Sequence, residues 1–259
     1  MRIARFSTGD DPRYGVVEQD GDDEVVAVVE GDPLYRPVTF TGERVRLADV
    51  RLLAPVIPRS KVVGIGRNYA DHAAETGDEP PEEPQLFLKP NTAVVGPGDP
   101  VAYPRQSSEV NPEAELAVVI GRICRDVPKE LALHVVFGYT CGNDVTAKDL
   151  QRADGHRSRA KSFDTFCPLG PWIETHLDVR DLAVTATVNG EKRQDGRTSQ
   201  MIHDVPTVIA HVSSVMTLLP GDVILTGTPA GVGPVAVGDE VSVTVEGVGT
   251  LTNRMVSRD

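Results

Sequence analysis

The chain has 259 residues, 40% of them hydrophobic and 25% charged, which is typical of an ordinary globular protein of one or two domains. Its 26 Lys and Arg against 38 Asp and Glu give a net charge of −12, which disfavours binding to nucleic acid but leaves room for a small anion in a locally positive pocket. No run approaches the ~20 apolar residues of a membrane-spanning helix, and the three cysteines form no Cys-x-x-Cys pair. We therefore expect a cytoplasmic protein without membrane contact and without a thiolate metal site.

The first 58 residues predict a small, β-rich N-terminal domain. Segments 14–18 and 24–30 favour strands, and the turn-forming run Gln-Asp-Gly-Asp-Asp separates them. Residues 52–61 contain Pro55 and Pro58 and are typical of a linker. We expect one domain over residues 1–58 and a second over residues 59–259. The alternative is that residues 1–58 add a sheet to a single domain.

The next segments predict short strands with few helices. Strands are expected at residues 61–65, 86–88, 114–120 and 137–141. A short helix is expected at 68–75, and another opens at Asp126 and Pro128 and runs to about residue 136. The acidic, proline-rich run 78–84 cannot form regular structure and predicts a mobile surface loop.

The second half of the chain is richer in strands. Asn189-Gly190 predicts a type I′ turn between strands 184–188 and 191–194. Residues 205–218 have helical periodicity, and strands are expected at 223–225, 240–246 and 250–256. Strands outnumber helices and do not alternate with them regularly. This pattern predicts a mostly-β α+β fold and argues against a doubly wound sheet or a TIM barrel.

The first candidate for chemistry is a pair of glutamates at the start of the strand 114–120. Glu113 and Glu115 are two residues apart, so their side chains point to the same face of a strand. Two neighbouring carboxylates repel each other unless a cation joins them. The alternative is that this strand end is exposed and that both glutamates are simply solvated. A glycosidase pair is disfavoured, because its two carboxylates usually come from different segments.

A third carboxylate, Asp144, follows the strand 137–141 and is expected to end near the same layer. Three carboxylates without a nearby Cys or His suit a hard cation, Mg²⁺ or Mn²⁺, and disfavour zinc. An isolated Asn143-Asp144 pair is otherwise more often a turn or a helix cap.

The second candidate is His72 with Glu75. On a helix, residues three apart share a face, and a carboxylate against an imidazole orients it as a general base. On spacing alone, a chance pair on a surface helix is the commoner explanation. The acidic loop that follows favours the catalytic interpretation, because mobile loops beside catalytic groups often act as lids.

Other motifs give weaker or negative signals. Lys161 lies among small and apolar residues and could balance buried carboxylates, although an exposed lysine is the commoner case. The glycine-rich run 226–233 lacks the lysine and the spacing of a Walker motif. Gly64-Ile-Gly66 is an incomplete dinucleotide fingerprint, and no Gly-x-Ser-x-Gly hydrolase motif occurs.

Six ordered motifs together resemble the fumarylacetoacetate hydrolase family, over about residues 60–257. They are VGIGRNYADH (63–72), FLKP (87–90), EAELAVVIG (113–121), GNDVTAKDLQ (142–151), KSFDTFCPLGP (161–171) and LPGDVILTGTPAGVG (219–233). Residues 1–58 resemble the small N-terminal domain of bacterial isomerases of this family that act on 2-hydroxyhepta-2,4-diene-1,7-dioate. One local departure is Pro112 and Ala114 around the first glutamate, where many members have an aromatic residue and glycine.

The resemblance implies a mixed β-sandwich roll around a divalent metal, in a homodimer. By motif position it implies that Glu113, Glu115 and Asp144 are the metal ligands. It also implies a base dyad on a lid, an active-site lysine and a set of substrate contacts. These residues are His72 and Glu75 for the dyad, Lys161 for the lysine, and Arg67, Lys89, Gln151 and Thr228 for the substrate.

The implied chemistry is metal-assisted work on a small anionic 2-oxo or β-dicarbonyl acid. Mg²⁺ or Mn²⁺ would chelate adjacent carboxylate and oxo oxygens and stabilise an enolate. Three outcomes share that enolate: isomerisation or decarboxylation of hydroxy-diene-dioates, C–C bond hydrolysis of acylpyruvates, and decarboxylation or tautomerisation of oxaloacetate. Hydrolysis would additionally need His72, supported by Glu75, to activate water. The sequence leaves these outcomes open.

Two hypotheses from other functional classes compete with the hypothesis of an enzyme. A non-catalytic family member could bind a metal-chelated ligand, but the chain keeps both His72 and Glu75, which argues against it. A nucleotide-binding protein is disfavoured by the missing lysine in the run 226–233.

Overall fold

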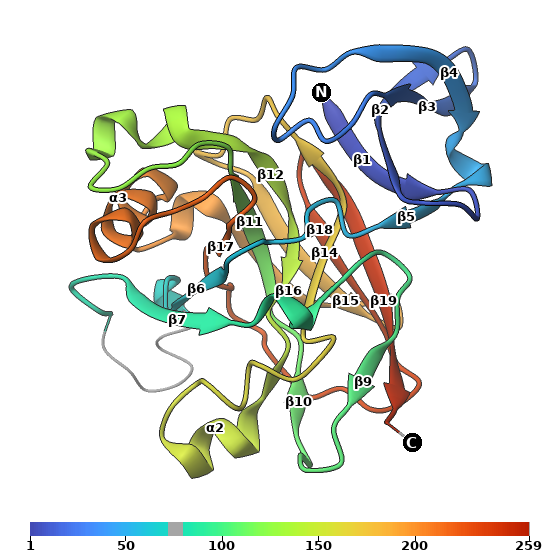
Figure 1. Cartoon of the computed structure of the whole chain (residues 1–259). Coiled ribbons are helices and arrows are strands. Elements are labelled where there is room, and N and C mark those ends of the chain that lie inside the picture. The colour runs from blue at the N-terminus through green and yellow to red at the C-terminus, as the bar shows by residue number, and fades with distance from the viewer. Residues whose placement is uncertain (72–79, 259) are drawn as a thin grey trace.

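Two β-sheets share the core of the protein in this computed structural model, which describes residues 1–71 and 80–258 (Figure 1). The large sheet has the strand order β4-β3-β2-β1-β14-β12-β11-β17-β6-β7, with β5 paired to β1 and β8 to β14. Its strands are β1 (Arg2–Ser7), β2 (Arg13–Asp20), β3 (Asp23–Val29), β4 (Phe40–Arg46), β5 (Arg51–Leu53), β6 (Val62–Gly66), β7 (Gln85–Lys89), β8 (Val94–Val95), β11 (Ala114–Ile120), β12 (Val136–Asn143), β14 (Cys167–Glu174) and β17 (Val223–Leu225).

The second sheet has the order β16-β15-β18-β19-β9, and β10 pairs with β13 in a short ladder. These strands are β9 (Val101–Tyr103), β10 (Val110–Asn111), β13 (Thr146–Ala147), β15 (Ala183–Val188), β16 (Glu191–Arg197), β18 (Glu240–Val245) and β19 (Gly249–Ser257). The described helices are α2 (Lys148–Asp154), α3 (Val205–Val215) and the 3₁₀ helices η1 (Leu47–Asp49), η2 (Asn91–Ala93), η3 (Lys129–Val135) and η4 (Thr198–Gln200). This architecture confirms the expected mostly-β α+β fold. Among the described helices, none is long and apolar enough to span a membrane.

Strand β11 is buried along its whole length because both of its faces pack against apolar layers. Leu116 and Val118 face a core shared with the second sheet and α3. Ala117 and Val119 face a second core, shared with β14, β17 and β1. The even alternation places Glu115 on the same face as Ala117 and Val119. The strand that carries Glu115 and directly follows Glu113 is therefore packed from both sides.

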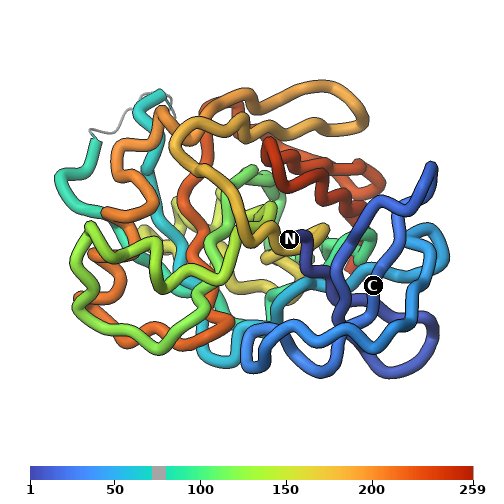
Figure 2. The backbone as a smooth tube through the Cα atoms, turned by 90° about the horizontal axis from the view of Figure 1, so that it is seen from above, coloured from blue at the N-terminus to red at the C-terminus, as the bar shows by residue number. Residues whose placement is uncertain are grey.

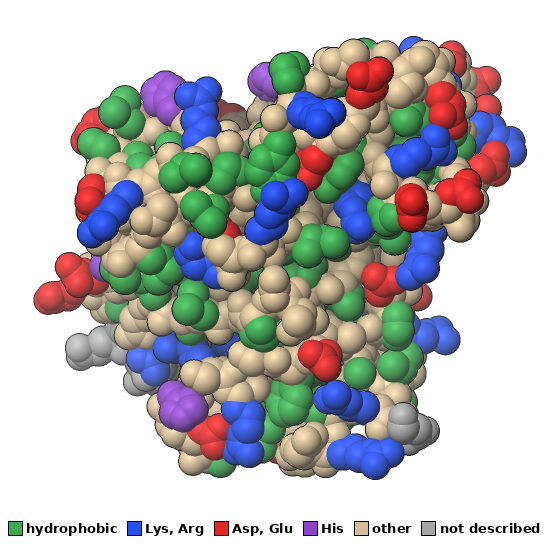
Figure 3. Space-filling view, in the orientation of Figure 1, with side chains coloured by type: hydrophobic (Ala, Val, Ile, Leu, Met, Phe, Trp, Pro, Cys, Tyr) green, Lys and Arg blue, Asp and Glu red, His purple; other side chains and the backbone are tan. Residues whose placement is uncertain are grey.

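The N-terminal strands lie together at one end of the molecule in both views (Figures 1 and 2). β1 pairs with β14, which joins these strands to the large sheet. The outer strand β4 is almost wholly exposed, and this end carries many charged side chains of both signs (Figure 3). That residues 1–58 fold as a domain of their own stays a prediction.

The hairpin at Asn189-Gly190 is confirmed, since both residues have positive φ between β15 and β16. Two expected helices differ from the structure. The element after Pro128 is a 3₁₀ helix of seven residues, η3, and it leads directly into β12. Helix α3 ends at Val215, since Leu218 forms backbone hydrogen bonds with Cys124 instead.

The expected helix 68–75 is described only at its start. Ala70 and Asp71 are helical, whereas Asn68 precedes the helix and bonds through its side chain to His203 and Thr226.

Strand β14 is not among the expected strands, because Pro168, Gly170 and Pro171 are unfavourable in a strand.

Candidate metal centre

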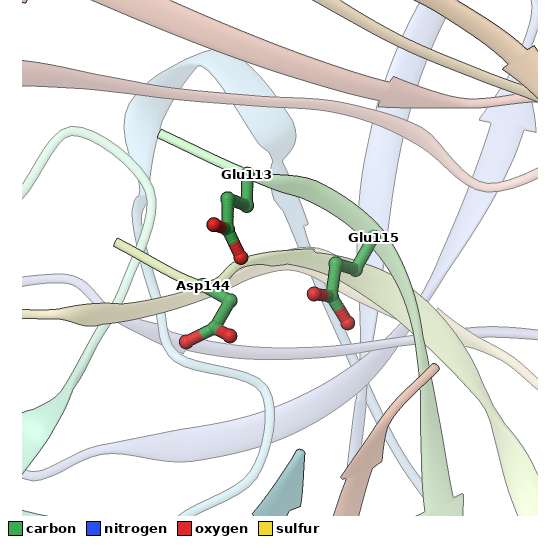
Figure 4. A group of neighbouring side chains, drawn as sticks. All are labelled: Glu113, Glu115 and Asp144. Atoms are coloured by element: carbon green, nitrogen blue, oxygen red, sulfur yellow. The ribbon is translucent and has the colours of Figure 1, made fainter. Parts of the chain in front are cut away.

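Three carboxylates meet where two neighbouring strands of the large sheet end. Glu113 and Glu115 flank the first residue of β11, and Asp144 directly follows β12, which is antiparallel to β11. One oxygen of each carboxylate lies within 4.8 Å of the others, and all three residues are buried. Figure 4 shows the three side chains pointing toward one another. The expected cluster is therefore present as a geometric fact, and the alternative of solvated glutamates does not hold.

Three lysines lie against these carboxylates. Nζ of Lys161 donates to Oε2 of Glu113 at 2.9 Å and also to Asp144 and Thr146. Nζ of Lys89 lies 2.6 Å from Oδ1 of Asp144, and both Lys89 and Lys161 are buried. The third contact joins Nζ of Lys148, the first residue of α2, to Oε1 of Glu113 at 2.5 Å. The three positive charges offset the three negative ones.

Glu115 differs from its neighbours, because it accepts a hydrogen bond from the backbone. The amide of Gly227 donates to its Oε2 at 2.6 Å. Burial, together with the carboxylates of Asp144 and Glu113, raises the pKa of Glu115 well above its usual value. The opposing effects of Lys161 and of the Gly227 amide do not cancel this rise. A buried carboxylate in that position is stabilised by any further cation that reaches it.

Lys161 has the opposite balance. Burial alone would lower the pKa of Lys161, but the adjacent carboxylates of Asp144 and Glu113 raise it above the usual value for lysine. The hydrogen bonds from Nζ to Glu113, Asp144 and Thr146 are those that an ammonium group donates. Phe87 covers it, with the ring centroid 4.9 Å from Nζ.

The carboxylates open into a cavity of about 360 Å³. Its walls are built by β6 and β7 on one side, by α2 and the segment after it on another, and by the loop after β17. The lining residues are Ile65, Gly66, Arg67, Phe87, Glu113, Glu115, Asp144, Lys148, Gln151, Arg152, Arg157, Lys161 and Thr228. Within a chain of net charge −12, five of these side chains are cationic and three are anionic.

The sequence-predicted substrate residues are only partly brought together. Arg67, Gln151 and Thr228 line the cavity. In the described part of the chain, Oε1 of Gln151 is buried without a hydrogen-bond partner and can accept a hydrogen bond from a ligand. Thr228 donates its hydroxyl proton to the carbonyl of Ala114 at 2.8 Å, so it also fixes the loop against β11. Lys89 is not among the described lining residues and contacts Asp144 instead.

His72 and Glu75 lie outside the described residues. Their expected role as a base dyad therefore stays a prediction.

The structure adds Phe87, Lys148, Arg152 and Arg157 to the site. Lys148 and Arg152 lie on α2 at a spacing of four from each other, with Gln151 between them on the same face. That spacing was visible in the sequence and could have identified them once Gln151 was chosen. Phe87 and Arg157 carry no local signal, because tertiary contacts alone bring β7 and the segment after α2 to the cavity.

The donor set fits a hard divalent cation. Its three described ligand groups are all carboxylates, which Mg²⁺ and Mn²⁺ prefer over nitrogen or sulfur. The lysines that contact the cluster pair with Glu113 and Asp144, whereas Glu115 accepts a hydrogen bond from the backbone amide of Gly227.

Comparisons with known proteins find similar sequences and structures over the whole chain. The family described as fumarylacetoacetate (FAA) hydrolase C-terminal matches residues 61–256, and an Rv2993c-like N-terminal family matches residues 1–55. Protein Rv2993c of Mycobacterium tuberculosis is 51% identical over 263 residues, covering 100% of this chain and 99% of that protein. Human mitochondrial oxaloacetate tautomerase FAHD2A is 45% identical over 221 residues, covering 81% of this chain and 70% of that protein.

The crystal structure of 5-carboxymethyl-2-hydroxymuconate delta-isomerase from Mycobacterium smegmatis is similar to this structure. The TM-score is 0.93 at 52% sequence identity, and the match covers 100% of both chains. The family match spans the whole of the cavity described above, including all three carboxylates. The chain therefore belongs to the fumarylacetoacetate hydrolase family, whose members are enzymes.

Proposed function

We propose that the protein is a divalent-metal-dependent isomerase that moves a proton between the enol and keto forms of a small 2-oxo acid. The observation that carries this proposal is the buried triad Glu113, Glu115 and Asp144 at the floor of a cavity rich in cations. Similar proteins carry the names isomerase and oxaloacetate tautomerase, which supports this reaction class for the chain.

The proposed cation is Mg²⁺ or Mn²⁺, held by the three carboxylates. When bound, the cation would act as a Lewis acid toward the oxo and carboxylate oxygens of the substrate. The chain's own residues then account for binding and orientation. Lys161, held by Glu113 and Asp144, places an ammonium beside the reacting end and offsets negative charge that develops on the oxo oxygen.

Proton transfer at carbon needs a base. We propose His72, oriented by Glu75, on the ground of the sequence resemblance. The described cavity residues supply binding: Arg67 offers a guanidinium for a carboxylate, and Gln151 offers an acceptor for an enol hydroxyl.

Decarboxylation and C–C bond hydrolysis are the alternatives within the same site. They differ from isomerisation in what leaves or enters: carbon dioxide leaves in the first, and water enters in the second. The experiment that separates them is a substrate panel on the EDTA-stripped protein with added Mg²⁺ or Mn²⁺. The panel holds oxaloacetate, acetylpyruvate and a hydroxy-diene-dioate, followed by enol absorbance and by product mass.

Metal-dependent loss of enol absorbance without a change of mass supports the proposal. Loss of CO₂ or gain of water would replace it with one of the two alternatives. Metal binding without turnover of any substrate would instead favour a non-catalytic member. Glu115→Gln should abolish the metal-dependent rate, and Glu43→Gln, in an exposed ion pair on the N-terminal strands, is the matched control.

A homodimer is also part of the proposal. Leu131, Leu133 and Val215 are 52%, 48% and 59% exposed, and they lie on η3 and α3, which pack together. Large apolar side chains that are exposed together mark surfaces that a partner covers. Light scattering should give the mass of two chains, and the mass of one chain would contradict this part.

A further inference from the structure

Strand β16 is the outer strand of the second sheet, yet it turns one glutamine inward. Five of its seven residues are exposed, and the two buried ones are Gln194 and Gly196. The pairing with β15 passes over Arg193, so a β-bulge precedes Gln194 and directs its side chain to the buried face. A buried amide needs hydrogen-bond partners, and those of Gln194 lie beside the carboxylate triad.

The side-chain amide of Gln194 reaches from the second sheet to the loop after β17 and to the start of β11. Its Nε2 donates to Oγ1 of Thr228 at 2.8 Å and to the carbonyl of Pro229 at 2.7 Å. Its Oε1 accepts a hydrogen bond from the backbone amide of Ala114 at 2.9 Å. A Cβ on Gly196 would lie 2.4 Å from the Cβ of Pro229, so the loop lies directly against β16.

Thr228 closes a ring of three hydrogen bonds with Gln194 and Ala114. The hydroxyl of Thr228 accepts from Gln194 and donates to the carbonyl of Ala114 at 2.8 Å. The amide of Ala114 then donates back to Gln194. Together the two side chains satisfy both backbone groups of the one residue that separates Glu113 from Glu115.

These side chains take the place of a neighbouring strand. The amide of Asp144 donates to the carbonyl of Glu113 at 2.9 Å, so the backbone groups of the next residue, Ala114, point away from β12. On that other side, β17 pairs with Ala117–Val119, further along β11. A buried backbone amide and carbonyl without partners are costly, and the ring removes that cost at Ala114.

We propose that Gln194 is a positioning residue that sets the relative placement of Glu113 and Glu115 and fixes the Thr228 hydroxyl at the cavity wall. Because the two glutamates are attached on either side of Ala114, a shift of its backbone moves their carboxylates relative to each other and to Asp144. This inference rests on the proposed function, since it assumes that the three carboxylates hold a cation.

The test measures Mn²⁺ affinity by calorimetry on the EDTA-stripped, full-length protein. Gln194→Met keeps the length of the side chain and removes its three hydrogen bonds. We expect roughly 10- to 100-fold lower Mn²⁺ affinity, the usual effect of losing a group that orients a metal ligand. Urea unfolding of the same variant shows that it is folded and measures its loss of stability.

Variants of Thr228 test the ring independently of Gln194. Thr228→Val keeps the shape and removes the hydroxyl, so it should also lower Mn²⁺ affinity. Thr228→Ser keeps the hydroxyl and should bind Mn²⁺ as the wild type does. In the double variant with Gln194→Met and Thr228→Val, the two losses should not add, because both substitutions break the same ring.

Asn253→Leu is the matched control for a lost buried amide. Asn253 is 3% exposed on β19, and its Nδ2 donates to the carbonyls of Gly96 and Asp99, both at 2.8 Å. None of these three residues lines the cavity. Asn253→Leu should lower the free energy of unfolding, as Gln194→Met does, but leave Mn²⁺ affinity unchanged.

The outcomes separate this inference from the proposed function. If the wild type binds Mn²⁺ and folded Gln194→Met and Thr228→Val variants bind it equally well, Gln194 is not a positioning residue and the proposed function stands. Additive losses in the double variant, or a loss in Asn253→Leu as large as in Gln194→Met, would also overturn the inference. If the wild type binds no Mn²⁺, both the inference and the proposed function are wrong.

Discussion

The backbone amide of Gly227 donates a hydrogen bond to Oε2 of Glu115 across 2.6 Å, and so joins the loop after β17 to the acidic cluster where β11 begins and β12 ends. Gly227 has φ +97°, and a Cβ there would lie 2.7 Å from the Cβ of Asn68. Thr226 and Thr228 on either side bond to the carbonyls of Leu116 and Ala114. The glycine-rich loop thus orients a carboxylate.

Substituting the glycine should therefore weaken metal binding indirectly. In Gly227→Ala, the positive φ and the close approach to Asn68 shift the amide away from Glu115. We expect roughly 10- to 100-fold lower Mn²⁺ affinity, the usual effect of losing a group that orients a ligand. Calorimetry on the EDTA-stripped variant measures it. Unchanged affinity in a folded variant would show that the Gly227 amide does not position Glu115.

In the metal-free protein, the ammonium of Lys161 should stabilise the fold by offsetting the charge of the buried carboxylates. In Lys161→Met, the carboxylates of Glu113 and Asp144 lose a buried partner, which typically costs about 3–5 kcal/mol. Added Mn²⁺ should recover part of this loss, because it offsets the same charges. Urea unfolding of wild type and variant, with EDTA and with Mn²⁺, measures the difference. An equal loss under both conditions would contradict a cation site at these carboxylates.

Asp222 offers a stability change that leaves the site intact. Its carboxylate is fully buried and accepts hydrogen bonds from Lys61, Ser60 and the amide of Leu219. Asp222→Ala leaves these donors, including the ammonium of Lys61, without their partner and should lower the free energy of unfolding by about 3–5 kcal/mol. Mn²⁺ affinity at low temperature should stay that of the wild type. A parallel loss of Mn²⁺ binding would mean that the two networks are coupled.

Asp149 should contribute a stability that depends on pH. Partial burial pushes the pKa of Asp149 upward, but hydrogen bonds from Ser107, Ser108 and the amide of Leu150 outweigh it and lower the pKa to about 2. Because the folded-state pKa lies below the usual value of 3.8, the stabilisation is complete above pH 3.8 and is lost as the pH falls toward 2.

Asp149→Asn should therefore lower the free energy of unfolding by about 1 kcal/mol at pH 7, and the difference should shrink between pH 4 and pH 2. Chemical unfolding at a series of pH values measures it. A difference that grows with falling pH would have the wrong sign for this account.

Much of the site followed from local patterns in the sequence, and the part that did not depends on tertiary contacts. The alternation along 113–120 placed Glu113 and Glu115 on one face, because a strand's side-chain period is short-range. The role of Lys89 as a substrate contact rested on motif position, and the structure places its Nζ on Asp144. Arg157 could not be foreseen, since the room for it is made by Gly66, far away in the sequence.

In the fold, too, some elements follow from local sequence patterns and others depend on tertiary contacts. The hairpin at Asn189-Gly190 and the strand β11 depend on residues next to one another, and both were predicted. Strand β14 contains Pro168 and Pro171, which disfavour a strand locally, yet pairing with β1, β12 and β8 makes it central to the large sheet. The helix ending at Val215 is shorter than its periodicity suggested, because Leu218 pairs with Cys124.

We propose that Glu113, Glu115 and Asp144 hold one divalent cation on which turnover depends. The most direct measurement is a titration of the EDTA-stripped protein with Mn²⁺ in which bound Mn²⁺ and the rate of oxaloacetate tautomerisation are recorded in the same samples. We expect bound Mn²⁺ and the rate to rise together and to saturate at one Mn²⁺ per chain, and we expect Glu115→Gln to remove both. Full turnover by the stripped protein before any Mn²⁺ is added would contradict it.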